Sequence, residues 1–136
     1  MTMQFSDATT NAALDAIETA AGTAPTLEIR SGAKPTNCAS ADAGTLLASI
    51  VLPSDYLTAA SSRAKAKNGV WTGAGGAGAG AGTNAGHFRI KQGATCHIQG
   101  SITITAGGGD MQLDNVSIAD GQAFTVNTFA LTGPAA

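Results

Sequence analysis

The second half of the chain alternates apolar and polar residues with a period of two, and this alternation limits the possible folds more than any other feature. Phe88 and Ile90 stand between polar side chains, and a similar alternation runs through residues 95–104. Successive side chains of a β-strand point to opposite faces, whereas a helix has a period near 3.6. The pattern therefore predicts half-buried strands and a β-rich fold.

These two strands are expected to form an antiparallel hairpin around residues 92–94. Pairing Ile90 with Cys96 and Phe88 with Ile98 would place the apolar side chains on one face of the hairpin. The other face would then carry solvated or interface side chains, among them His87, Arg89 and His97.

Further strand-like runs lie on both sides of this hairpin, separated by turns rich in Gly, Pro and Asp. They cover residues 26–30, 44–52, 70–72, 111–118 and 123–131. Residues 44–52 are apolar on both faces, which favours a central or doubly covered strand. In the last run the large apolar residues stand at even-numbered positions up to Val126 and at odd-numbered positions after it. A bulge near residues 127–128 would bring both sets of apolar side chains to the same face. About seven short strands predict a mainly β fold, either a β-sandwich or a jelly-roll-like barrel.

Residues 1–22 predict a short N-terminal helix, an arm beside a β-sandwich domain of residues 23–136. Ser6 or Asp7 can cap its first turn, and Gly22 can end it. One stripe of the helix holds Thr10, Leu14, Ile17 and Ala21. A helix with so narrow an apolar stripe is marginal alone, so it either packs on its own domain or docks on a neighbouring molecule.

Residues 73–82 contain only glycine and alanine. Such low complexity is typical of a mobile surface loop. Alternatively, a backbone without side chains can lie flat against a partner, because nothing prevents close approach.

Large apolar side chains are scarce for a chain of one-domain length. Of the 136 residues, 28 are alanine, whereas Leu, Ile, Val and Phe together number 24. Apolar burial contributes about 25 cal/mol per Å², which in a small domain barely offsets the conformational entropy. We therefore expect stability to be shared, through a homodimer or homotrimer or through docking on a larger assembly.

Charge and cysteine content exclude several classes of protein. A net charge of −2 and a pI near 5.4 argue against a nucleic-acid binder. The sequence has no apolar run long enough for a membrane span. Residues 1–7 lack the basic and apolar regions of a signal peptide, so synthesis in a cytoplasm is expected. Cys38 and Cys96 are then expected to be free and reduced, with a disulfide as the alternative.

No combination of residues predicts an enzyme or a cofactor site. His87 and His97 lack a carboxylate on a neighbouring strand that would complete a zinc site. Asp110, Asp114 and Asp120 do not have the spacing of a calcium loop, and they suit turns instead.

Two surface hypotheses remain. Trp71 and Tyr56 either form a sugar-binding platform or belong to the core. Arg63, Lys65 and Lys67 alternate, so an extended backbone would place them on one side. There they are either solvated or set against an acidic surface of a partner.

Four segments resemble small β-rich virion proteins of tailed bacteriophages and prophages. They are TLEIRSGAKP at residues 26–35, GTLLASIVLPSDYL at 44–57, AGHFRIK at 85–91 and MQLDNVSIADGQAFTVNTFALT at 111–132. The likeness covers most of the chain after the helix and includes no catalytic motif. Such proteins include capsid decoration, or cement, proteins, which join neighbouring capsomers at two-fold or three-fold positions of the shell; similar proteins occur in tails.

The resemblance implies a structural role on the capsid surface of a virion, with the major capsid protein as partner and neither nucleic acid nor membrane. The alternatives are a tail connector or completion protein, or a host-surface or carbohydrate-binding module of a tail or fibre. The residues that we expect at the protein interface are Phe5, Leu14, Ile17, Arg63, Lys65 and Lys67.

Overall fold

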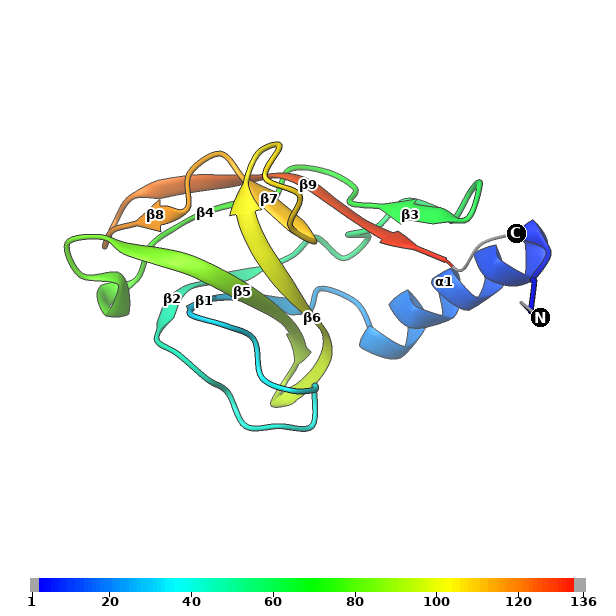
Figure 1. Cartoon of the computed structure of the whole chain (residues 1–136), viewed down its shortest axis with the longest axis horizontal. Helices are drawn as coiled ribbons and strands as arrows, with labels where there is room; N and C mark the ends of the chain where they lie inside the picture. Colours follow the sequence, from blue (N-terminus) through cyan, green and yellow to red (C-terminus); the bar gives the residue numbers. More distant parts are fainter. Residues whose placement is uncertain (1–2, 134–136) are drawn as a thin grey trace.

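A computed structural model describes residues 3–133; residues 1–2 of the expected arm and 134–136 of the expected β domain lie outside the described part. Strands account for 44% of the structure and helices for 14%, which confirms the mainly β class. The strands form a large mixed sheet with a β-sandwich-like arrangement, and a helix precedes them (Figure 1).

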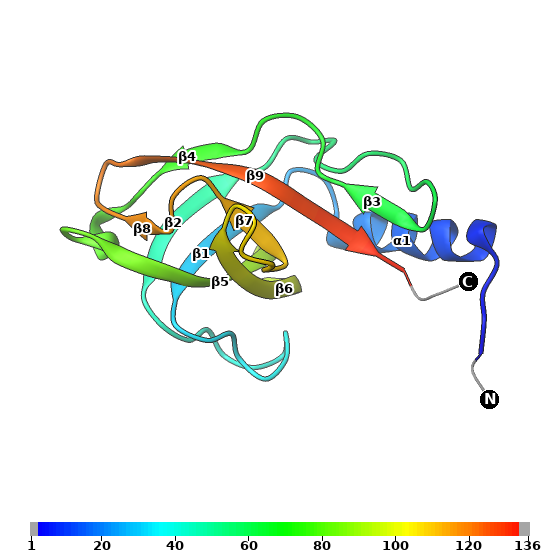
Figure 2. The same ribbon diagram turned by 45° about the horizontal axis from the view of Figure 1, so that its top comes forward.

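In chain order the elements are α1 (Asp7–Ala21), β1 (Thr26–Ser31), β2 (Leu46–Val51), β3 (Ala64–Ala66), β4 (Thr72–Ala74), the 3₁₀ turn η1 (Ala77–Ala79), β5 (Thr83–Gln92), β6 (Thr95–Ile104), β7 (Met111–Leu113), β8 (Ser117–Ile118) and β9 (Ala123–Thr132). The strand order in the sheet is β2-β1-β5-β6-β7-β9-β3, while β4 also pairs with β9 and β8 with β5. β6 and β7 are parallel. α1 lies at one end of the molecule, beside β3 (Figure 2).

α1 is capped as the sequence predicts. The hydroxyl of Ser6 accepts a hydrogen bond from the backbone N–H of Thr9 at 3.2 Å, and Gly22 ends the helix with a φ of +82°. The buried stripe is narrower than expected, because Ile17 is 38% exposed. The residues buried on this helix are Thr10, Leu14 and Ala21.

Trp71 and Tyr56 belong to the core. Their exposed fractions are 1% and 0%, and the ring of Trp71 lies 5.4 Å from that of Phe129, centre to centre. The indole N–H donates to the carbonyl oxygen of Asn68 at 3.1 Å. Neither ring can serve as a sugar-binding platform here, because stacking needs an exposed ring face.

β1 and β2 differ in how they are covered. Leu27 and Ile29 of β1 are fully buried, as the alternation predicted. The prediction of a central strand at 44–52 is wrong, because β2 is at the end of the strand order. Both faces of β2 are covered at Leu47 and Ala48, which are buried, but Val51 is 71% exposed.

The glycine- and alanine-only segment lies against β2 of the same chain, in contrast to the mobile surface loop expected. The backbone N–H of Gly76 donates to the carbonyl oxygen of Leu47 at 2.8 Å. A Cβ added at Gly78 would overlap the carbonyl oxygen of Leu46. The glycine backbone therefore lies close to another strand of the same chain, because β4 and η1 pack beside β2.

β5 and β6 form the expected hairpin in a different register. Ile90 lies opposite Ile98 and Phe88 opposite Gly100, because a bulge after Ile90 shifts the pairing. The predicted pairs, Ile90 with Cys96 and Phe88 with Ile98, are therefore wrong. A Cβ at position 100 would lie 2.8 Å from Cε1 of Phe88, so this register gives the ring the space left by a glycine.

β9 contains the bulge that the sequence predicts. Gln112 lies opposite Thr128 and Leu113 opposite Val126, which leaves Asn127 as the extra residue. Residues of both parities are consequently buried: Phe124, Val126 and Phe129.

Candidate functional site

α1 is held by residues 57–67, which we call the docking segment. Nζ of Lys65 lies 2.8 Å from Oδ1 of Asp15 and 2.7 Å from Oε2 of Glu18. The backbone N–H of Ala60 donates to the same carboxylate of Asp15 at 3.1 Å. The middle of the helix is thus fixed to the docking segment by charged hydrogen bonds.

Arg63 holds the beginning of the helix. Its guanidinium lies 2.9 Å from Oδ1 of Asp7 and donates to the carbonyl oxygen of Phe5 at 2.9 Å. Its backbone N–H donates to Oδ1 of Asn11 at 3.0 Å. Arg63 therefore uses both side chain and backbone to position α1.

The charged contacts shift two pKa values. Burial of Lys65, whose side chain is 3% exposed, lowers its pKa, but the hydrogen bonds to Asp15 and Glu18 outweigh burial, so that the pKa lies above its usual value. The hydrogen bonds from Lys65 and then from Ala60 lower the pKa of Asp15. The geometry therefore favours the ionised pair.

The predicted interface residues divide into two groups. Leu14, Arg63 and Lys65 contact their own chain, and Lys67 donates to the carbonyl oxygen of Gly69 at 2.9 Å. Arg63 and Lys65 were expected to be solvated or to face an acidic surface of a partner. In the structure their acidic partners lie on α1 of the same chain. A role for any of these four residues in binding a partner stays a prediction.

Phe5 and Ile17 form the second group and face outward. Their exposed fractions are 40% and 38%. A shallow apolar hollow of about 120 Å³ adjoins Phe5, and Thr9, Thr10 and Ala13 line the rest of it. The rest of this outer face consists of small exposed side chains: Ala8, Ala12, Ala13, Ala16 and Ala20. The outer face of α1 is thus uncharged and open to a partner.

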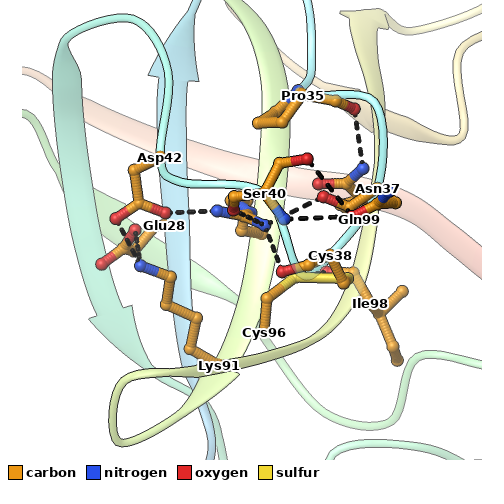
Figure 3. Close-up of a disulfide and its surroundings, with 11 residues drawn as sticks. Glu28, Pro35, Asn37, Cys38, Ser40, Asp42, Lys91, Cys96, Ile98 and Gln99 are labelled. Atoms are coloured by element: carbon orange, nitrogen blue, oxygen red, sulfur yellow. Dashed lines mark hydrogen bonds and ion pairs between the residues drawn. A yellow bond between two sulfur atoms is a disulfide. The ribbon is translucent and has the colours of Figure 1, made fainter.

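A second cluster lies beneath residues 32–45, which we call the cover loop (Figure 3). Three basic side chains of the sheet share two carboxylates there: Arg30, Arg89 and Lys91 with Glu28 and Asp42. Nζ of Lys91 lies 2.6 Å from Oδ2 of Asp42 and 3.1 Å from Oε1 of Glu28. The hydrogen bond from Lys91, together with that from Arg89, lowers the pKa of Asp42.

The cover loop buries the polar face of β5. The guanidinium of Arg89, whose side chain is 2% exposed, donates to the carbonyl oxygens of Cys38 at 2.8 Å and Ser40 at 3.1 Å. His87 is fully buried, and its Nδ1 lies 2.9 Å from the carbonyl oxygen of Gly32. The prediction that His87 and Arg89 are solvated or interface residues is therefore wrong for this chain, because its own loop covers them.

A disulfide joins the cover loop to β6. Cys38 and Cys96 are 58 residues apart in sequence, with their Cα atoms 5.2 Å apart. That spacing is typical of disulfides. The expectation of free thiols is wrong, because the cover loop returns across the sheet and brings the two cysteines together.

Two of the late aspartates accept hydrogen bonds from the backbone of neighbouring strands, β6 and β9. A carboxylate oxygen of Asp110 accepts from the backbone N–H of Ser101 at 2.9 Å, and one of Asp114 accepts from that of Thr125 at 3.0 Å. Within residues 3–133, no three His, Cys, Asp or Glu side chains are grouped so that they could hold a metal ion.

An open hollow of about 680 Å³ separates the C-terminal half of α1 from the chain around residues 54–59. Asp15, Glu18, Asp55 and Lys65 line it. Lys65 already pairs with two of these carboxylates, so their charge serves to hold the helix.

The part of the chain that the structure describes has no helix with the length and apolar character of a membrane span. Comparison with protein-family models, with curated proteins and with solved structures gave no significant match.

The ion-pair cluster of Arg30, Arg89 and Lys91 with Glu28 and Asp42 was not predicted from the sequence, although one signal for it is present. Glu28 and Arg30 occupy the polar positions of β1, and Arg89 and Lys91 those of β5. Had the two strands been placed side by side, Glu28 would have faced Arg89, as it does in the structure. Asp42 gave no such signal, because it lies in a loop without periodicity.

Proposed function

We propose that this chain is a non-catalytic structural protein of a tailed-phage virion, a capsid decoration protein that stabilises the shell by binding the major capsid protein. The observation that carries the proposal is the uncharged outer face of α1, with Phe5 and Ile17 exposed. Apolar side chains gathered on one exposed face are typical of a surface that another protein covers.

The use of the charged residues supports a structural role. Most of the basic side chains are ion-paired within the chain: Arg30, Arg63, Lys65, Arg89 and Lys91. These groups hold the helix and the cover loop on the sheet, so their charges stabilise the fold.

The disulfide supports a location on the outside of a particle. Disulfides persist in oxidising surroundings and are rare in a cytosol. A chain made in the host cytoplasm would complete the Cys38–Cys96 bond once the particle leaves the cell, and the cover loop would then be held covalently.

Copy number in purified particles tests the proposal. Quantitative mass spectrometry of intact virions should find hundreds of copies if the chain coats the shell. A handful of copies would overturn the capsid assignment in favour of a tail connector or completion protein. Absence from particles would reject a virion role.

Binding to purified capsids tests whether the outer face of α1 is the docking surface. The double substitution Phe5→Asp/Ile17→Asp should weaken binding by at least about tenfold, because it places charge in an apolar contact. Thr36→Asp, on the exposed part of the cover loop, is the matched control and should bind as the wild type. Equal binding by the double variant would show that α1 is not the docking face.

A further inference from the structure

The contact between α1 and the docking segment joins two stretches of opposite charge. The acidic residues of 1–22 are Asp7, Asp15 and Glu18, and this stretch contains no Lys or Arg. The basic residues of 56–72 are Arg63, Lys65 and Lys67, and this stretch contains no Asp or Glu. Each stretch therefore complements the other, whichever copy of the chain supplies it.

α1 is separable from the body of the protein. It carries its own caps, Ser6 and Gly22. Its large apolar contribution to the interior is Leu14, and the aromatic packing around Trp71 does not involve the helix. The position of α1 at one end of the molecule (Figure 1) agrees with this separation.

The connection between α1 and β1 is short and strained. Ala24 has a φ of +47°, in the left-handed region that disfavours a residue with a Cβ. Pro25 follows directly and restricts the backbone before β1. Short hinge segments under strain favour the exchange of an element between identical chains, because opening the hinge relieves the strain.

We propose that α1 is an exchangeable arm: the helix of one copy of this chain occupies the docking segment of a second copy, and the second copy returns its own helix. The ion pairs of Asp15 and Glu18 with Lys65 then form between chains with the same partners. Residues 22–25 span at most about 14 Å when extended, so the two bodies lie side by side.

Mass action decides which form is populated. The closed monomer predominates in dilute solution, and the exchanged dimer at high concentration or where a repeating surface gathers copies. The inference does not depend on the virion proposal, because its test uses the purified chain alone.

Charge reversal distinguishes the two forms. One variant carries Asp15→Lys and Glu18→Lys in the helix, and the other carries Lys65→Glu in the docking segment. Each variant alone has like charges at the contact. Refolded together at equal concentration, the two should form a heterodimer with matched charges at both contacts, and light scattering should show a doubled mass. A mixture that stays monomeric would overturn the proposal.

The chain with all three substitutions is the control for folding, because it restores matched charges within one copy. Disulfide trapping replaces the variants with substitutions only in the helix or only in the docking segment if they fail to fold. In that experiment an Asp15→Cys chain is mixed at high concentration with an isotope-labelled Ala60→Cys chain. An inter-chain crosslink should form well above the yield with Asp120→Cys, a position that follows β8 in sequence. β8 lies at the end of the molecule opposite α1 (Figure 1). A yield equal to that control would contradict helix exchange.

Discussion

Asp42 and Lys91 are 49 residues apart in sequence, and Nζ of Lys91 donates to Oδ2 of Asp42 at 2.6 Å. This contact, with the neighbouring one to Arg89, fixes the cover loop on the polar face of β5. It converts a strand face that would otherwise be solvated into a buried one.

Removing the charge of Asp42 should destabilise the fold. In Asp42→Asn, Arg30 and Lys91 would keep Glu28 as a partner, whereas the buried Arg89 would lose the carboxylate with which it pairs. We expect a loss of about 2 kcal/mol in the free energy of unfolding. The figure is below that of a fully buried pair, because the side chain of Asp42 is 32% exposed and solvent screens it. Urea denaturation measures the loss. Asp120→Asn, exposed and outside the cluster, should change stability by less than about 0.5 kcal/mol.

The effect of Asp42→Asn should depend on pH. The pKa of Asp42 in the folded chain is lowered from 3.8 by its hydrogen bonds to Lys91 and Arg89. The carboxylate therefore contributes stability above pH 3.8, and this contribution is lost as pH falls through the lowered pKa. Unfolding curves of wild type and variant should converge in acid. A constant difference from pH 7 to pH 2 would show that the charge of Asp42 is not the cause.

The phenol of Tyr56 should lose its proton at a higher pH than a free tyrosine. Burial, with a smaller contribution from Glu18, raises its pKa from 10.0 to about 12. Because Tyr56 is the single tyrosine of the chain, ultraviolet absorbance of the phenolate follows it directly. The neutral phenol contributes stability below pH 10 that is lost as pH rises toward 12. Tyr56→Phe should remove the absorbance change, and a midpoint near 10 in the folded protein would contradict the burial.

Reduction of the disulfide should cost about 4 kcal/mol of unfolding free energy, the loop-closure value for two cysteines 58 residues apart. Denaturation with and without a dithiol reductant measures it. The Cys38→Ser/Cys96→Ser variant should match the reduced wild type and should not respond to reductant. If the oxidised and reduced proteins unfold at the same denaturant concentration, the cover loop is held by its ion pairs alone.

Two glycines of the same segment should respond differently to alanine. Gly78→Ala should cost about 2 kcal/mol or more, because its Cβ would overlap the carbonyl oxygen of Leu46. Gly76→Ala is the control: its Cβ would have its nearest neighbour at 3.7 Å, an ordinary contact. Thermal unfolding compares them. Equal melting temperatures would show that the segment does not lie against β2.

Local periodicity determined much of the fold from the sequence. The strands around Leu27 and Ile29, the caps of α1 and the bulge at Asn127 were predicted, because each depends on neighbouring residues along the chain. The register of β5 with β6 was not, because it depends on the space that Gly100 leaves for the ring of Phe88.

The partners of the charged and sulfur-containing side chains were decided by the tertiary structure alone. Arg89, Lys65 and Cys38 each have a partner more than 40 residues away, in the cover loop, on α1 and on β6 respectively. No local pattern of the sequence encodes these pairings. The sequence by itself determined where the helix and the longer strands form, since periodic burial is a local property; the short strand β3 was not predicted. Which polar face is covered, and by what, depended on the chain returning across its own sheet, where opposite charges are stabilised only once they meet.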